Sequence, residues 1–226
     1  MQHSLTQFAK TGFEVIPDFL SKQQLEQARE ILKPFSLDQG RGGVRNIHQS
    51  SAATLNLIKN LGFEAIARSY LGDTPHLVRS ILFDKTARNN WTVAWHQDRT
   101  IAVSGMQELE NWGPWTVKAG VIHVEPPRSV LESMITCRLH LDDTNTENGC
   151  LRMLAGSHNE GILTTEDIKE LLKNNEPVEL EVAAGALIVM RPLCLHASRK
   201  ASNPSSRRIL HLEFSSAELP SGIFWN

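Results

Sequence analysis

The sequence has few cysteines, no long apolar run and no excess of charge of one sign, and each absence excludes a class of protein. Its three cysteines, Cys137, Cys150 and Cys194, are odd in number and lie in or beside apolar stretches. This pattern favours buried free thiols over a disulfide framework, so we expect a reducing, cytoplasmic location. No window approaches the roughly 18 apolar residues of a membrane span. The N-terminus lacks the basic segment and apolar core of a secretory signal.

Charge and composition favour a small molecule as the partner. The 23 lysines and arginines nearly balance 25 acidic residues, which gives a net charge of -2. No bulk field therefore draws the chain to nucleic acid or to an anionic membrane. With 226 residues the chain is long enough for one substantial core. We expect a single domain over residues 1–226, with a small-molecule substrate, no nucleic-acid or membrane partner, and a monomeric or weakly homodimeric state.

The N-terminal part, about residues 1–75, is predicted to be mainly helical. Ser21 is a candidate N-cap for a helix over residues 22–33, which Pro34 would end. Two further helices are predicted over residues 51–60 and 64–70, and a glycine-rich loop over residues 39–44.

From about residue 76 the pattern changes to short apolar runs separated by turn dipeptides such as Asn148-Gly149. The predicted strands cover residues 76–84, 92–97, 134–142, 150–155, 177–182, 186–192 and 208–214. Many short strands without long helices between them predict a mainly β fold with flanking α, an antiparallel jelly roll over about residues 76–216 with the early helices outside. The stretch 99–127 is too long for a hairpin loop, so we expect a lid or substrate loop there.

The segment Trp95-His96-Gln97-Asp98 indicates a metal site. Residues two apart in a strand share a face, so His96 and Asp98 converge while Gln97 points away. His196 closes the apolar run 186–195, where a strand would deliver it to the mouth of the barrel. Two histidines and one carboxylate leave three positions of an octahedral Fe(II) open for a bidentate oxo-acid and dioxygen. A His-X-Asp pair alone is a weak signal, because solvent-facing strands often contain one by chance.

A longer set of motifs strengthens this interpretation. The motifs are Trp95 to Asp98, His140 to His158 with its Asn-Gly turn and Gly-Ser-His end, Gly185 to Ser198, and Arg207-Arg208. In order and spacing, over roughly residues 80–215, they resemble the phytanoyl-CoA dioxygenase family of oxygenases. The resemblance implies a double-stranded β-helix of the cupin-like type, Fe(II) held by His96, Asp98 and His196, and 2-oxoglutarate as cosubstrate. It also implies hydroxylation of a C–H bond, with succinate and CO2 released, and leaves the prime substrate open.

The cosubstrate needs a fixed cation at its far carboxylate, and the guanidinium fork of an arginine suits that task. In the resembling family an arginine follows the distal histidine by about ten residues, and Arg207 lies eleven beyond His196. Arg207 shares a strand face with His211 and Glu213, whereas Arg208 shares one with leucines. We predict that Arg207, on the mixed polar face, is the anchor; Arg208 stays open as the alternative.

Two further residues resemble cosubstrate contacts of the family, Ser198 two positions after the distal histidine and Lys85 just before the metal strand. A turn cap and a solvated lysine are equally good readings of these two. Asp142 and Asp143 are predicted to shape the turn that follows them, and His158 to be a structural hydrogen-bonding residue. His123, His140 and His211 stay unassigned.

The intact Asp98 favours hydroxylation over halogenation, because related halogenating enzymes replace this carboxylate by a small residue. Desaturation, epimerisation and cyclisation stay open. Two other functions compete: a catalytically silent jelly roll that binds a small ligand, and a zinc hydrolase, since two histidines and a carboxylate also suit zinc. A zinc hydrolase would not need the arginine anchor.

Overall fold

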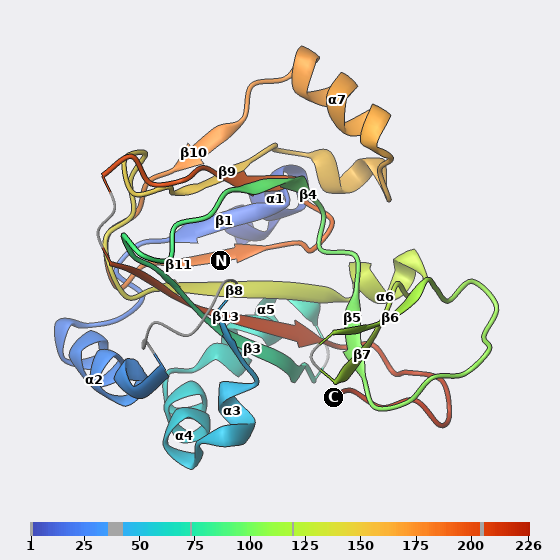
Figure 1. The fold of residues 1–226 in the computed structure, drawn as a ribbon, viewed down its shortest axis with the longest axis horizontal. Coiled ribbons are helices and arrows are strands. Elements are labelled where there is room, and N and C mark those ends of the chain that lie inside the picture. Colours follow the sequence, from blue (N-terminus) through green and yellow to red (C-terminus); the bar gives the residue numbers. More distant parts are fainter. Residues whose placement is uncertain (1, 36–42, 73, 119, 204–205) are drawn as a thin grey trace.

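The computed structural model describes residues 2–35, 43–72, 74–118, 120–203 and 206–226 (Figure 1). Its helices are α1 (Gln2–Thr11), α2 (Lys22–Leu32), α3 (Ile47–Ser50), α4 (Ala52–Asn60), α5 (Phe63–Leu71), α6 (Arg128–Glu132) and α7 (Thr165–Asn174), with 3-10 turns η1 (Lys33–Phe35) and η2 (Ser157–Glu160). Its strands are β1 (Phe13–Ile16), β2 (Val44–Arg45), β3 (His76–Lys85), β4 (Val93–His96), β5 (Ile101–Val103), β6 (Trp115–Lys118), β7 (Val121–Val124), β8 (Met134–His140), β9 (Leu151–Met153), β10 (Val178–Leu180), β11 (Leu187–Met190), β12 (His196–Ser198) and β13 (Arg207–Ser215). Within these residues, none of the helices has the length and apolar character needed to cross a membrane.

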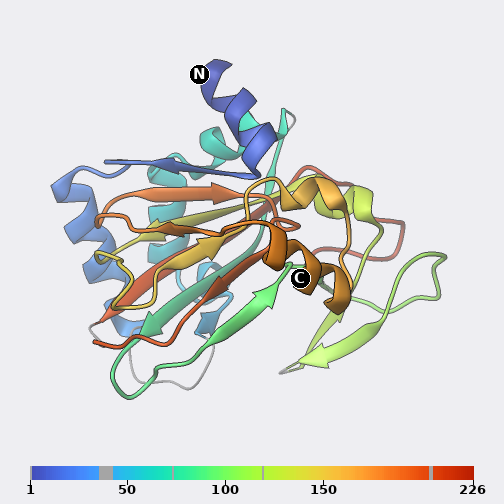
Figure 2. The same ribbon diagram turned by 90° about the horizontal axis from the view of Figure 1, so that it is seen from above.

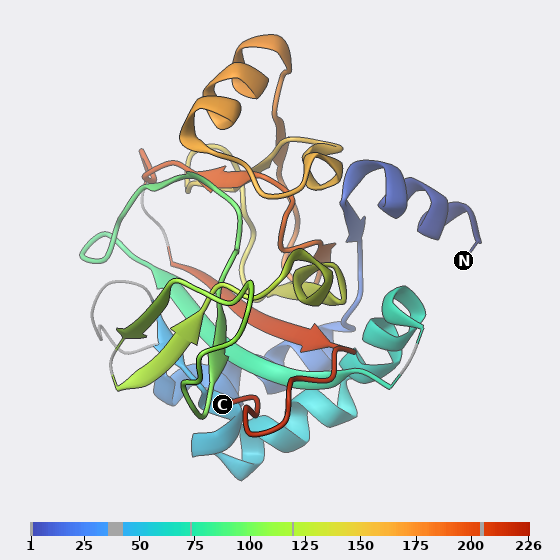
Figure 3. The ribbon, with the colours of Figure 1, turned by 90° about the vertical axis from the view of Figure 1, so that its right-hand side faces the viewer.

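Two antiparallel sheets form the jelly roll. The larger sheet has the order β1-β11-β8-β13-β3-β2, and the smaller has the order β10-β9-β12-β4. Seen from two directions, the smaller sheet lies between α7 and the larger sheet, and helices α2 to α5 lie beyond the larger sheet (Figures 1 and 3). The predicted fold class, a mainly β double-stranded β-helix with flanking helices, is confirmed.

The helices on the outer face of the larger sheet begin where the capping residues predict. Ser21 caps α2 in a reciprocal capping box with Gln24, and Ser51 caps α4 by accepting from the backbone N–H of Thr54. The main apolar core lies between these helices and the sheet, and includes Leu32, Phe63, Leu139, Leu187 and Leu210. Truncating one such fully buried leucine to alanine costs about 2–5 kcal/mol. The core therefore fixes which face of each strand points inward to the second sheet.

Besides its helices, the N-terminal part contributes two short strands that the sequence did not suggest. The four-residue strand β1 pairs with β11 and so forms one edge of the larger sheet, with α1 beside it (Figure 2). The even shorter β2 forms the opposite edge against β3. Strands this short are stable only as additions to an existing sheet, so their own sequence gives a weak signal. The predicted loop over 39–44 falls mostly outside the described residues.

The stretch 99–127 is more ordered than the predicted loop. It contains a three-stranded antiparallel sheet of order β5-β7-β6, at the same end of the molecule as α6 and the C-terminus (Figures 1 and 3). Its buried residues Ile101, Val103 and Val124 pack with Ile223 and the segment around Trp225. The β-branched residues in these short runs explain why they form strands. A covering role over a substrate remains a prediction.

The cysteines agree with the expectation from their number. Cys137, Cys150 and Cys194 are all buried and free of disulfides. Burial raises the pKa of Cys194 to about 12, so this thiol stays protonated at neutral pH. The predicted buried free thiols are confirmed.

Candidate metal centre

The two histidines of the predicted triad face each other across paired strands. His96 ends β4 and His196 begins β12, and the antiparallel register sets them directly opposite. Their ring centroids are 4.2 Å apart. Asp98 follows two residues after His96, where its backbone N–H donates to the carbonyl of Pro192 at 2.9 Å. The structure therefore brings together the three residues that the sequence singled out.

Backbone hydrogen bonds fix the orientation of both imidazoles. His96 Nδ1 lies 2.9 Å from the carbonyl oxygen of Ala94, and His196 Nδ1 lies 2.9 Å from that of Cys194. A carbonyl oxygen only accepts, so each Nδ1 carries the proton and each Nε2 keeps its lone pair. Nε2 of His96 is 3.6 Å and Nε2 of His196 is 3.5 Å from the Asp98 carboxylate. One donor atom from each residue lies within 4.8 Å of the others, and this pattern of second hydrogen bonds is typical of metal-binding histidines.

The charge state of the triad suits a divalent cation. Burial lowers the pKa of His196 to about 4, so its imidazole is neutral at pH 7. Burial raises the pKa of Asp98, but the two neighbouring histidines outweigh this and hold it below its usual range. Burial lowers the pKa of His96, but Asp98 outweighs this and raises it, so a proton on His96 must leave when a metal binds. A metal requires neutral imidazoles and an ionised carboxylate of these ligands.

A cavity of about 90 Å3 lies beside the triad, between the two sheets. The smaller sheet contributes the two histidines and Ser198, and the larger sheet contributes Arg138 and Arg207. The remaining lining residues are Phe83, Trp91, Val93, Asp98, Leu151, Ala197 and His211. The cavity thus combines a metal-ligand set with two buried guanidinium groups.

The predicted cosubstrate residues lie together beside this cavity, which Arg207 and Ser198 line. Arg207 is 3% exposed, its Nη1 donates to the carbonyl of Gly149 at 2.5 Å, and its Nε is buried without a partner among the described residues. Lys85, directly opposite on β3, donates to Ser198 Oγ at 3.1 Å and to the carbonyl of Arg199 at 2.8 Å. Burial, together with Arg207 and Arg138, lowers the pKa of Lys85 to about 7. Neither Arg207 nor Lys85 has a carboxylate partner among the described residues, which is the arrangement expected of an anion site.

Arg208 lies on the other face of β13. Its side chain makes a bidentate pair with Asp142, with Nε and Nη2 donating at 2.8 and 2.7 Å. Asp143 accepts from the backbone N–H of Ala184 at 2.7 Å, so both acids hold backbone and side chains around the turn. The structural interpretation of this acidic pair is confirmed.

Two residues near the site have contacts that the sequence did not suggest. Gln97, between His96 and Asp98 just after β4, is buried; its amide donates to the carbonyls of Gly161 and Leu193 and accepts from the N–H of Leu163. It therefore ties the metal strand to the segments before α7 and β12. Arg138 on β8 points into the cavity, and its signal was the polar alternation of Thr136, Arg138 and His140 along an otherwise apolar run.

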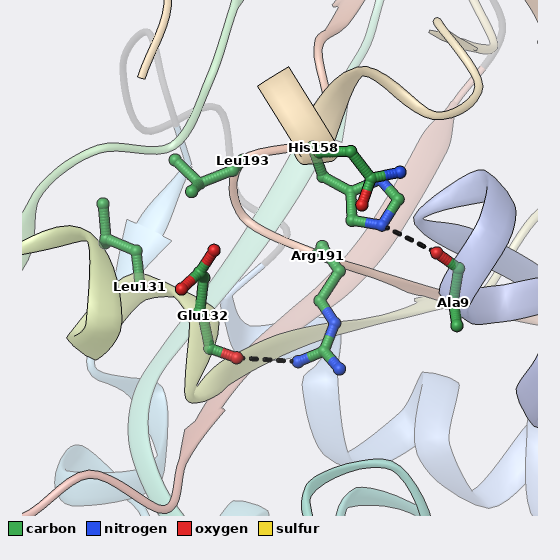
Figure 4. A pocket seen from close by; sticks show the side chains of 7 residues that line it. Ala9, Leu131, Glu132, His158, Arg191 and Leu193 are labelled. Carbon is green, nitrogen blue, oxygen red and sulfur yellow. Dashed lines mark hydrogen bonds between the residues drawn. The ribbon is translucent and has the colours of Figure 1, made fainter. Parts of the chain in front are cut away.

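A second, larger depression of about 260 Å3 lies away from the triad (Figure 4). Its polar groups bind the backbone: His158 Nε2 donates to the carbonyl of Ala9 at 3.1 Å, and Arg191 Nη1 donates to that of Glu132 at 2.9 Å. Among the residues that the structure describes, the one cluster with metal-ligand geometry is the triad. His158 is thus a hydrogen-bonding residue of the fold, as predicted.

Comparison with known proteins agrees with this geometry. Ectoine dioxygenase from Nocardia farcinica (strain IFM 10152) is 21% identical over 251 residues, covering 95% of this chain and 77% of that protein. The crystal structure of HygX from Streptomyces hygroscopicus with nickel and 2-oxoglutarate bound has 17% identity and a TM-score of 0.67, covering 95% of this chain and 86% of that one. The epimerase SnoN in complex with Fe3+, alpha ketoglutarate and nogalamycin RO has 15% identity and a TM-score of 0.72, covering 98% and 86%.

These structural similarities, at under 25% identity, show the shared fold. The family assignment comes from the sequence, because the profile described as phytanoyl-CoA dioxygenase (PhyH) matches residues 8–209, nearly the whole chain and all three residues of the triad. The chain belongs to the phytanoyl-CoA dioxygenase (PhyH) family.

Proposed function

We propose that this protein is an Fe(II)- and 2-oxoglutarate-dependent oxygenase whose metal is held by His96, Asp98 and His196. The observation that carries the proposal is one donor atom from each residue, all within 4.8 Å, beside a cavity lined by Arg207. Two histidines and one carboxylate are the facial ligand set of such oxygenases. Relatives with the same fold, HygX and SnoN, bind nickel or iron together with 2-oxoglutarate, which supports the choice of metal and cosubstrate.

Iron with 2-oxoglutarate supplies the oxidising chemistry, in which dioxygen oxidises the cosubstrate to succinate and CO2 and a substrate C–H bond to C–OH. The chain supplies the geometry. The hydrogen bonds from Nδ1–H of His96 and His196 to the carbonyls of Ala94 and Cys194 orient both Nε2 lone pairs toward one point. The imidazole rings therefore do not need to reorient when a metal binds. Asp98 supplies a negative charge that stays ionised throughout the neutral range, because its pKa lies below its usual value.

The cosubstrate end is built for a carboxylate. Arg207 offers its unpartnered Nε and Lys85 a nearby ammonium. Ser198 Oγ accepts from Lys85, so its own proton is free to donate to a bound anion. Gly149, whose carbonyl accepts from Arg207, must be glycine, because a Cβ at its left-handed φ of +79° would lie 2.5 Å from the carbonyl of Arg199. We propose that Arg207, Lys85 and Ser198 bind the far carboxylate of 2-oxoglutarate.

Hydroxylation of a small molecule is the outcome we propose. Asp98 keeps the third ligand position filled, which disfavours halogenation. A zinc hydrolase has no use for a buried arginine and lysine opposite the triad, and a silent ligand-binding protein has no need of both Nε2 atoms converging on a carboxylate. The prime substrate must fit the cavity between the two sheets.

The test is an anaerobic titration of the apo-protein with Fe(II) and then 2-oxoglutarate, recording the weak visible charge-transfer band of a bidentate oxo-acid on iron. We expect a band in the wild type and none in His96→Ala. Aerobic incubation should then release succinate with Fe(II) and not with Zn(II). Folded, iron-loaded protein without a band would refute the oxygenase proposal in favour of silent binding, and turnover of an ester or amide with Zn(II) would favour hydrolysis.

A further inference from the structure

Positive charge continues along the inner face of the larger sheet, away from the cosubstrate end. The strand registers align Arg45 on β2 with Ile81, Ile81 with His211, and His211 with Arg138 on β8. Directly paired residues of antiparallel strands point to the same face, so this row lies on the face that Arg207 also uses. His211 is four residues from Arg207, roughly 13 Å along the strand. His211 and its neighbour Arg138 therefore lie farther along the sheet than Arg207 at the proposed cosubstrate end.

Arg138 is the buried member of this row. It is 8% exposed, lines the cavity beside the triad, and packs over the ring of Phe83 with its guanidinium carbon 5.7 Å from the centroid. Its one hydrogen bond to a described residue runs from Nη1 to Nδ1 of His211 at 3.0 Å. Its Nε is buried and has no partner in the part of the chain that the structure describes. Unused donors of a buried cation are costly unless a ligand satisfies them.

The nearest acid in this network is already engaged. Glu213 accepts from His211 Nε2 at 3.0 Å and from Arg79 Nη1 at 3.3 Å. Since His211 accepts from Arg138 and donates to Glu213, its imidazole is neutral and brings no negative charge to Arg138. Asp98 is committed to the metal. Fe(II) and the 2-oxoglutarate dianion together are neutral, so the cavity keeps a positive excess even when both are bound.

More cations surround the approach to this row. Besides burial, Arg79 lowers the pKa of Arg45, and Arg79, Lys118 and Arg45 all lower that of His123 on β7. These residues come from β2, β3 and the small sheet of β5, β6 and β7, which meet at this end. Since the whole chain has a net charge of -2, this concentration of positive charge is local. A positive approach raises the local concentration and the on-rate of anions.

We infer that the prime substrate is a small molecule bearing an oxyanion (carboxylate, phosphate or sulfate), which Arg138 binds inside the cavity while Arg45 and Lys118 attract it to the entrance. This inference rests on the proposed function, because it assigns Arg207 and Lys85 to 2-oxoglutarate. Arg138 then determines which C–H bond of the substrate reacts, because the distance from Arg138 to the metal sets how far that bond lies from the substrate's oxyanion. It is a specificity-determining residue.

The experiment uses inorganic phosphate and 13C-labelled acetate as probes on the full chain. The protein is loaded with Mn(II) and saturated with N-oxalylglycine, an unreactive analogue of 2-oxoglutarate that fills the cosubstrate end. Paramagnetic relaxation of the 31P or 13C signal then reports an anion bound near the metal. We expect saturable relaxation in the wild type, at least tenfold weaker binding in Arg138→Met, and intermediate binding in Arg138→Lys. Arg208→Met, on the outer face, should bind like the wild type.

Three results would overturn the inference. These are no saturable relaxation by either anion in the wild type, relaxation that is unchanged in Arg138→Met, or a Fe(II)–2-oxoglutarate band that needs far more cosubstrate in Arg138→Met while anion binding stays intact. The last result would make Arg138 a cosubstrate residue. If Arg138→Met does not fold, the exposed Arg45→Gln takes its place, with an expected two- to fivefold loss that disappears at high salt. The charge-transfer band in the wild type separates the two proposals, since it tests the oxygenase alone.

Discussion

Replacing Arg207 by methionine should weaken cosubstrate binding without lowering stability. Replacing its neighbour Arg208 by methionine should lower stability and leave cosubstrate binding unchanged. Arg207 is buried opposite Lys85, whereas Arg208 is on the outer face and paired with Asp142. Methionine is unbranched and fills the space of the aliphatic stem in both cases. The two variants are thus a matched pair that differ in the face of one strand.

For affinity, truncating one partner of a buried, hydrogen-bonded charge pair costs about 2–5 kcal/mol. That corresponds to a dissociation constant for 2-oxoglutarate raised by about 30-fold to about 5,000-fold in Arg207→Met. Arg208→Met should leave the constant unchanged, since its guanidinium lies outside the cavity. The assay is the anaerobic charge-transfer titration with saturating Fe(II).

For stability without cosubstrate, the order reverses. Burial lowers the pKa of Arg207 from 12.5 to about 10. Because the folded state binds this proton less tightly than the unfolded state, the buried cation destabilises the apo-protein at pH 7 by about 3 kcal/mol. Its removal offsets the lost bond to Gly149, worth about 1 kcal/mol. We expect Arg207→Met to melt at or above the wild-type temperature, and Arg208→Met to melt about 2–4 °C lower through loss of about 1 kcal/mol. Loss of affinity in Arg208→Met with normal affinity in Arg207→Met would refute the assignment of faces.

Three further predictions concern single residues of the site. The protonated form of Lys85 binds a carboxylate, and its pKa in the free protein is about 7. The affinity for 2-oxoglutarate should therefore fall about tenfold between pH 6.5 and 8.5. In Lys85→Gln the affinity should not change with pH over this range, and a persisting pH dependence would show that another group titrates. Gln97→Leu leaves two carbonyls and one N–H unpaired. It should lower the free energy of unfolding, measured by urea denaturation, by about 2–4 kcal/mol. An unchanged denaturation midpoint would show that water replaces the amide. Asp98→Ala should weaken Fe(II) binding in equilibrium dialysis by at least about 100-fold, with retained folding by circular dichroism as the control; unchanged iron binding would remove Asp98 from the ligand set.

Local rules were enough to predict the features that depend on one strand or one cap. The period of two placed His96 and Asp98 on one face, and the same period separated the faces of Arg207 and Arg208. The capping signal at Ser21 placed the start of α2 correctly. Each of these depends on residues within four positions of one another, where backbone geometry alone decides the outcome.

The rest depends on which strands become neighbours. Helix α7 begins at a capping box of Thr164 and Asp167, a local signal that the sequence itself contains. In contrast, β1 exists because β11 offers it an edge, and nothing in its own four residues announces that partner. The hydrogen bonds of Gln97 likewise join segments some 65 and 95 residues apart in the chain. Sequence periodicity predicts the face of a strand to which a side chain points. The contacts that this side chain makes depend on which strands and loops become its neighbours in the fold.

The two proposed anion sites follow from one property of the larger sheet. Its outer face is mostly filled by apolar side chains under the helices, so the polar residues of β8 and the middle of β13 point inward, whereas Arg208 at the start of β13 pairs with Asp142 on the outer face. Arg207, His211 and Glu213 therefore line up along β13, and Arg138 is set beside His211 by the register of β8. One end of that row faces Lys85 and the other faces Arg79, with the triad on the opposite sheet. A cavity with the metal between two separate sets of cations suits a cosubstrate and a substrate that are both anionic, each held from its own end of the row.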